Sequence, residues 1–126
     1  MFHQPVKFTL SNVAALKKAL RTRYANIRSS HADEAVAASF GFKTYAAMLV
    51  VLHQVNTSAR LVIQTDACLL ILRLEQLGYS GLSPRALRRM VWEVPYPDPW
   101  HEDELERSLR GRFAPIPANS QPDDVM

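Results

Sequence analysis

Apolar residues recur through much of this chain at spacings of three and four, the pattern of helices that bury one face. The first such stretch predicts a helix over residues 12–27, with Ser11 capping its first turn. Its inward stripe consists of Val13, Leu16, Leu20, Tyr24 and Ile27. We therefore expect one side of this helix in the core and the other in solvent.

Two further helices, over residues 31–40 and 45–54, are predicted to form a hairpin. Ser30 and Thr44 precede them, and their hydroxyls can accept the free N–H groups of a first turn. Gly41 stands between the helices as the residue able to take the left-handed conformation that ends a helix. The pattern is that of two helices joined at a glycine corner.

This hairpin has the outline of a DNA-binding helix-turn-helix unit, with a small residue at Ala37 and glycine at the corner. Such a unit reads bases through polar groups on its second helix, and Lys43, Thr44 and Tyr45 are of that kind. The helix then becomes apolar, with Met48, Leu49 and Leu52. The pattern favours a packing hairpin over a groove-reading helix, and both interpretations stay open.

The second half of the chain begins with a β-branched segment. Residues 60–65 and 5–10 are both predicted as short strands, and we expect residues near 6–10 to pair with those near 61–65. These would add at most a small two-stranded sheet to a helical protein.

A very apolar helix is predicted over residues 67–77, capped by Asp66 and ended by Gly78. Its large apolar residues are Leu69, Leu70, Ile71, Leu72, Leu74 and Leu77. Because they cover most of its circumference, we expect this helix to be central and buried. Cys68, the single cysteine, is expected to be a buried structural thiol.

Ser83 and Pro84 predict the start of another helix, which runs to about Glu93. Three prolines then stiffen residues 95–99, and a last helix is predicted over residues 101–110. Residues 112–126 are polar and proline-rich, as in disordered tails.

The predicted fold is mainly α, a compact bundle of about five helices in a single domain over residues 1–111. Hydrophobic residues make up 48% of the 126, which is enough to form a core without disulfides. Neither a secretory leader nor a membrane-spanning run is recognisable, so we expect a cytoplasmic protein.

Charge is distributed unevenly. The first 60 residues carry eight basic and two acidic side chains (+6), whereas residues 61–126 carry seven basic and ten acidic ones (−3). On the first predicted helix, Lys17, Arg21 and Arg28 fall in one sector beside the inward stripe, with Lys18 on its flank. They form the best candidate phosphate-binding surface. A second basic cluster contains Arg85, Arg88 and Arg89.

Catalytic and metal-binding patterns are not recognisable in the sequence. The histidines lack the close spacing of metal ligands, and phosphate-binding glycine loops and nucleophile motifs are missing. We therefore expect neither a metal nor a cofactor, and a binding protein rather than an enzyme, although a site assembled in space would leave no such pattern.

One segment resembles a known module. Residues 13–52 contain Ser30-His31, Glu34-Ala35 and the run Gly41-Phe42-Lys43-Thr44-Tyr45. This pattern is similar to a helical module of small uncharacterised bacterial proteins, some carried on mobile elements, and to the start of some glyoxalase-related proteins. The resemblance implies no settled activity. Glyoxalase chemistry is not carried over, because the chain after residue 60 is too short for that barrel and lacks its metal-ligand arrangement.

Three functional hypotheses follow from these patterns, the third being a small enzyme with a cryptic pocket. The first is a nucleic-acid-binding accessory or regulatory protein, monomeric or dimeric, with phosphate contacts from a basic helix and the hairpin. Its candidate residues are Lys17, Lys18, Arg21, Arg28, Lys43, Thr44 and Tyr45. The second is a protein-interaction module or inhibitor that docks through residues 95–100 and the acidic last helix. Its candidate residues are Tyr96, Trp100, Glu102 and Glu106. In that second class residues 95–100 are a dock for a partner. The alternative is a strap over the protein's own core, which the large apolar area of Trp100 favours.

Overall fold

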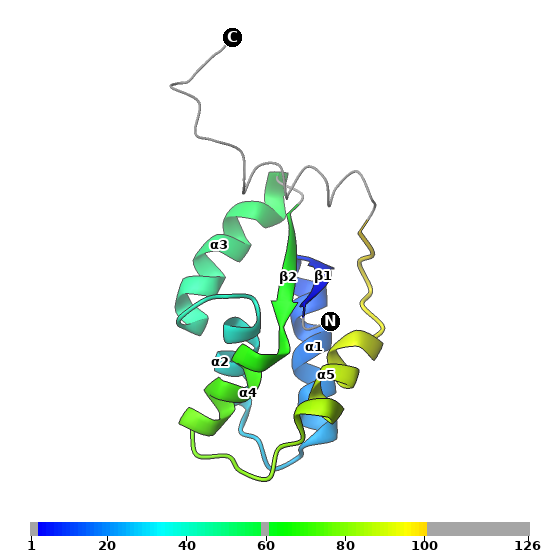
Figure 1. The fold of residues 1–126 in the computed structure, drawn as a ribbon. Coiled ribbons are helices and arrows are strands. Elements are labelled where there is room, and N and C mark those ends of the chain that lie inside the picture. The colour runs from blue at the N-terminus through cyan, green and yellow to red at the C-terminus, as the bar shows by residue number, and fades with distance from the viewer. Residues whose placement is uncertain (1–2, 59–60, 101–126) are drawn as a thin grey trace, which may run out of the picture.

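The computed structural model describes residues 3–58 and 61–100, with five helices and two strands in this part of the chain (Figure 1). The elements in order are β1 (His3–Lys7), α1 (Leu10–Arg23), α2 (Ser29–Ser39), α3 (Tyr45–Ser58), β2 (Val62–Asp66), α4 (Ala67–Gln76) and α5 (Pro84–Glu93). The predicted mainly α fold with a small two-stranded sheet is confirmed. The predicted helix over 101–110 and tail over 112–126 lie outside the described residues.

The predicted strand pairing is also confirmed. β1 and β2 form an antiparallel pair in which Val6 lies opposite Ile63, and the Phe8 N–H extends the pairing to the Leu61 carbonyl at 2.7 Å. Val6 and Phe8 are both buried, as the alternating pattern requires. The sheet therefore fastens the start of the chain to the core.

Helix boundaries depend on capping side chains, which the sequence predicted in part. Thr44, Asp66 and Ser83 cap α3, α4 and α5 as expected, each accepting a first-turn N–H. Two expectations were wrong. Thr9, not Ser11, caps α1, and α2 begins at Ser29 after Arg28, whose side chain makes no capping bond.

The central helix is α2. It packs against α1, α3, α4 and β2, and Ala32, Ala35 and Ala37 are fully buried in these contacts. Small side chains let neighbouring helices approach closely, so a helix of moderate hydrophobicity occupies the middle of the bundle. After α2, Gly41 adopts a φ of 88°, and the chain turns as the predicted corner requires.

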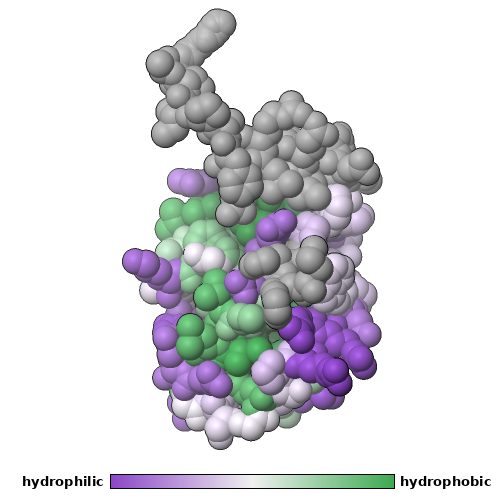
Figure 2. Space-filling view, viewed as in Figure 1, coloured by the Kyte–Doolittle hydropathy of each residue, from purple (hydrophilic) through white to green (hydrophobic). Residues whose placement is uncertain are grey.

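The expectation that α4 is central and buried was wrong. Ala67, Leu70 and Leu74 face the core, whereas Leu69 and Leu72 are 39% and 50% exposed. Cys68 is exposed as well, which corrects its assignment as a buried thiol. Figure 2 shows hydrophobic side chains gathered over α4 on the face in view.

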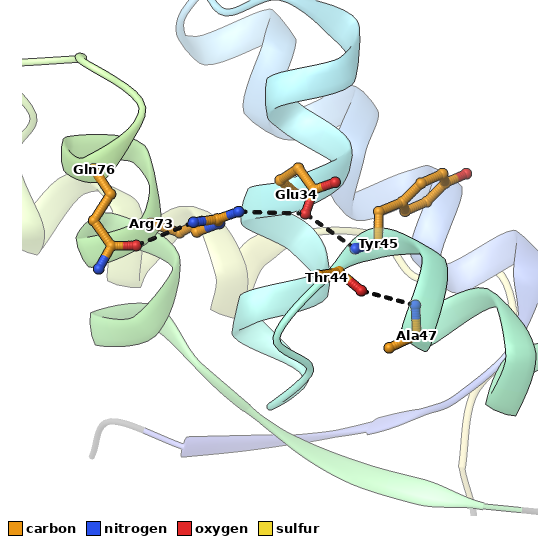
Figure 3. A network of polar contacts seen from close by, with 6 residues as sticks. All are labelled: Glu34, Thr44, Tyr45, Ala47, Arg73 and Gln76. Carbon is orange, nitrogen blue, oxygen red and sulfur yellow. Dashed lines mark hydrogen bonds and ion pairs between the residues drawn. The ribbon is translucent and has the colours of Figure 1, made fainter.

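A polar network joins three helices (Figure 3). Glu34 on α2 accepts a hydrogen bond from the Tyr45 backbone N–H at 3.0 Å and pairs with Arg73 on α4 at 3.6 Å. Arg73 in turn donates to Gln76 at 3.2 Å. The Glu34 carboxylate therefore fixes the start of α3 and one face of α4 to the central helix.

Two tyrosine hydroxyls hold the loop between α4 and α5. The Tyr79 hydroxyl accepts from the Arg28 backbone N–H at 3.0 Å and lies 2.8 Å from Nδ1 of His31. The Tyr24 hydroxyl accepts from the Ser83 N–H at 3.4 Å. These contacts connect the loop to the start of α2 and the end of α1, and they give His31 a structural role.

Candidate functional site: a basic groove between α1 and α5

The basic residues predicted on the first helix separate in the structure. Lys17 forms an ion pair with Asp33 of α2 at 2.9 Å, so that pair reduces the charge it presents. Lys18 and Arg21 are exposed, and Nε of Arg21 donates to the Ile27 carbonyl at 3.2 Å. The α1 helix thus has an α2-facing basic edge at Lys17 and a separate solvent-facing one at Lys18.

Arg28 does not belong to this helix. The predicted helix over 12–27 ends at Arg23, so the helical alignment of Arg28 with Lys17 and Arg21 was wrong. Arg28 instead precedes the first turn of α2, with its backbone N–H on Tyr79. Its exposed side chain lies beside the hairpin's first helix, outside the α1 surface.

The hairpin of α2 and α3 packs into the core through two of the apolar residues that argued against a groove-reading helix. Met48 and Leu52 are 0% and 1% exposed, which favours the packing interpretation. Lys43 and Thr44 are exposed at the start of α3, and the Thr44 hydroxyl accepts the Ala47 N–H. Tyr45 is half-buried. The exposed residues that follow, as far as Gln54, are Ala46, Ala47, Val50, His53 and Gln54, and only the last two offer hydrogen-bonding groups to base edges.

A concave surface lies between α1 and α5. Two adjoining cavities of about 440 and 700 Å³ share four lining residues, namely Ala19, Arg23, Val94 and Pro95. We call their union the α1–α5 groove. Lys18 and Arg23 contribute from α1, and Arg85 and Arg89 from α5. The apolar part of the lining consists mainly of Ala15, Ala19, Met90 and Val94.

The charge of this groove is strongly positive. Its described lining includes the four bases Lys18, Arg23, Arg85 and Arg89, and one acid, Glu93. The potentials of basic side chains around one concave surface add, and salt screens each of them over about one Debye length, roughly 8 Å at physiological salt. Figure 2 shows the most hydrophilic side chains of the visible face over α5, separate from the apolar surface of α4.

The outer side of α5 continues this basic surface. A depression of about 310 Å³ is lined by Arg85, Arg88, Arg89, Trp92 and Glu93. Trp92 is 49% exposed. Because Arg85, Arg89 and Glu93 also line the α1–α5 groove, the depression and the groove are contiguous.

Residues 95–100 follow α5 and return to the start of α1. The fully buried Asn12 donates to the Asp98 carbonyl at 2.7 Å and accepts its N–H at 2.9 Å, and Thr9 donates to the Asp98 carboxylate at 2.6 Å. The Tyr96 hydroxyl donates to the Val91 carbonyl at 3.2 Å, and burial raises the pKa of this phenol. These hydrogen bonds join residues 96–98 to the protein's own helices, as expected if residues 95–100 form a strap and not a dock for a partner.

Trp100 is half-buried and lines a cavity of about 260 Å³ together with Pro5, Val6 and Asn12. Its position beside the same cavity as the start of the chain agrees with the strap interpretation. Glu102 and Glu106, the other candidates for a protein-docking surface, lie outside the described residues.

The sequence pattern indicated three of the four basic residues of the groove, but not that they lie together. Lys18 was placed on the flank of the first cluster, Arg85 and Arg89 were assigned to a second cluster, and Arg23 was not a candidate. The available indication was that both helices carry arginines at their solvent faces, but their adjacency depends on the tertiary fold.

Within residues 3–58 and 61–100 the structure forms no cluster of three or more His, Cys, Asp or Glu side chains suited to a metal ion. The helices of this part are all too short or too polar to span a membrane. No family model matches this chain, and no curated protein or solved structure is significantly similar to it.

Proposed function

We propose that this chain is a small nucleic-acid-binding accessory or regulatory protein that holds phosphate groups in the α1–α5 groove. The observation that carries the proposal is the convergence of Lys18 and Arg23 with Arg85 and Arg89 around one concave surface. Guanidinium groups suit phosphate because their planar N–H donors match its oxygens in a bidentate geometry.

The groove suits a phosphate backbone better than a small anion. It is open and extends over two adjoining cavities, and its basic side chains come from both α1 and α5. A polyanion that follows the groove can contact several of them at once, and each contact releases condensed counterions. We therefore expect binding that depends strongly on salt and weakly on sequence.

The hairpin has less support as the reading element. Its second helix directs Met48 and Leu52 into the core, and α3 lies on the opposite side of the molecule from α5 (Figure 1). Lys43 to Tyr45 are accordingly remote from the α1–α5 groove. Docking of a protein partner through residues 95–100 also has less support, because Tyr96 and Asp98 already bond within the chain.

Fluorescence anisotropy with labelled DNA and RNA over a range of salt concentrations tests this proposal. The triple variant Arg23→Gln, Arg85→Gln, Arg89→Gln should weaken binding similarly for all sequences. If each arginine contacts one phosphate, the slope of the logarithm of the binding constant against the logarithm of the salt concentration should become smaller by about 2–3. Its melting temperature should stay close to that of the parent protein, because the arginine side chains lie on the surface.

The matched control is the triple variant Lys17→Gln, Arg21→Gln, Arg28→Gln, which removes the same charge from outside the groove. It should lose much less affinity than the groove variant. Equal losses would indicate a diffuse attraction and contradict a site in the groove. Failure of the parent protein to bind any DNA or RNA at low salt would eliminate the proposal, and loss of binding in Lys43→Gln would point back to the hairpin.

A further inference from the structure

We infer that the nucleic acid held by this surface is unpaired, and that Trp92 is the platform on which one of its bases stacks. This inference rests on the proposed function and goes beyond it by naming the class of ligand. Two observations carry it, namely the exposure of the indole and the continuity of its surroundings with the groove.

The exposure of Trp92 is unusual for so large an apolar side chain. It lies on the solvent face of α5, 49% exposed, where the neighbouring outward residues Arg85 and Arg89 are charged. Tryptophan on a protein surface is typical of binding sites, because its flat ring buries a large area at little cost in side-chain entropy. In this position the ring offers a stacking surface among cations.

The depression beside Trp92 adjoins the α1–α5 groove. Arg85, Arg89 and Glu93 line both, so a strand whose phosphates lie on the two arginines passes next to the indole. A basic track with an adjacent exposed aromatic ring is the arrangement by which proteins hold single strands without reading their sequence. Glu93 restricts where the backbone of the strand can lie, because its carboxylate repels a neighbouring phosphate.

A regular duplex uses this arrangement poorly. Its bases are stacked on one another and paired, so an indole outside the helix meets base edges and phosphates but no free base face. Access to a face requires unstacking, which costs several-fold to many-fold in affinity. An unpaired strand presents its faces freely, whether it is DNA or RNA, and the shared chemistry is a polyanionic backbone with accessible bases.

The test compares a 20-nucleotide strand without self-complementarity with its duplex, in DNA and RNA versions, by fluorescence anisotropy. The single strands should bind about tenfold or more tightly than the duplexes. Trp92→Leu should weaken single-strand binding by about fivefold to a hundredfold, the loss typical of one stacked base. Trp92→Phe should retain most of the affinity, and duplex binding should be nearly unchanged in both variants.

Two controls separate stacking from a structural role. Trp92→Leu should lower the melting temperature only slightly, because the side chain is 49% exposed and leucine keeps an apolar group over its buried half. In a Trp100→Phe background, where Trp92 is the remaining tryptophan, single strands should quench its fluorescence. Comparison of the DNA and RNA arms shows which polynucleotide is preferred.

Equal binding of single strand and duplex, with Trp92→Leu indistinguishable from the parent protein, would overturn the inference but leave phosphate binding in the groove intact. Single-strand binding that is retained in Trp92→Leu but lost in the triple variant of Arg23, Arg85 and Arg89 would also overturn the stacking role of Trp92 and leave phosphate binding in the groove intact. Loss of single-strand affinity in Trp92→Leu together with fluorescence quenching supports it.

Discussion

Asn12 on α1 and Asp98 after α5 are 86 residues apart, yet the Asn12 side chain bonds both backbone polar groups of Asp98. The same amide also donates to the Lys7 carbonyl at 2.8 Å. One buried side chain thus joins the end of β1, the start of α1 and the strap. No strand or helix supplies these bonds, so the position of the strap depends on this residue.

We expect Asn12→Ala to lower the free energy of unfolding by about 3 kcal/mol, because it removes three hydrogen bonds to partly buried backbone groups of Lys7 and Asp98. Urea denaturation measures this loss. Ser11→Ala, one position away and exposed, should change stability by less than about 0.5 kcal/mol. A similar small effect at both positions would show that water replaces the amide.

The strap also makes stability depend on pH through Tyr96. Burial raises the pKa of this phenol above its ordinary value of 10.0, so the folded state favours the neutral form. Below pH 10 the phenol is neutral in both states, and its full contribution to the free energy of unfolding is present. As the pH rises above 10 this contribution is lost, because the phenol ionises first in the unfolded chain. Tyr96→Phe, which cannot ionise, should therefore be less stable than the parent protein at pH 8, by about 1 kcal/mol for the lost hydrogen bond.

The difference between Tyr96→Phe and the parent protein should shrink between pH 10 and 11. Denaturation curves at several pH values measure it. A difference that stays constant over this range would mean that Tyr96 ionises as readily in the folded chain as in the unfolded one.

Gly41 should be sensitive to substitution for a purely conformational reason. A Cβ atom placed there would meet nothing within 4 Å, but the φ of 88° is unfavourable for residues other than glycine. Gly41→Ala should therefore cost about 1–2 kcal/mol. Gly41→Asn should cost less, because asparagine tolerates the left-handed region. Thermal denaturation of both variants compares them, and equal stabilities would argue against strain at this corner.

Cys68 should behave as a surface thiol. It is exposed on α4, so a thiol-reactive reagent should label it in the native protein at a rate close to that in denaturant. Cys68→Ser should change the free energy of unfolding by less than about 0.5 kcal/mol. Labelling that requires denaturation would restore the buried assignment that the sequence suggested.

Most of the helices and strands could be predicted from the sequence. Thr44, Asp66 and Ser83 each have a side-chain oxygen at the position where a first turn needs one, and Gly41 marks the corner. These are local effects, so a local pattern finds them. Where two caps were available side by side, as with Thr9 and Ser11, the pattern could not distinguish them.

Burial was less predictable because it depends on what packs nearby. The apolar composition of α4 suggested a central helix, yet neighbours cover one side of it and leave Leu69 and Leu72 exposed. The alanines of α2 gave little indication of a central position, since their burial follows from close helix contacts. The groove likewise exists because the fold places Arg23 of α1 and Arg85 of α5 around the same hollow. A single sequence does not indicate which helices are neighbours in this way.

The two tyrosine hydroxyls that hold the loop before α5 have a kinetic consequence for any ligand of the groove. Because Tyr79 bonds the start of α2 and Tyr24 bonds Ser83, α5 is fixed beside α1 in the free protein. Association then needs no prior rearrangement of that loop and loses no entropy in ordering it. The encounter rate should be limited by diffusion and orientation and enhanced by charge, and so decline steeply as salt is added.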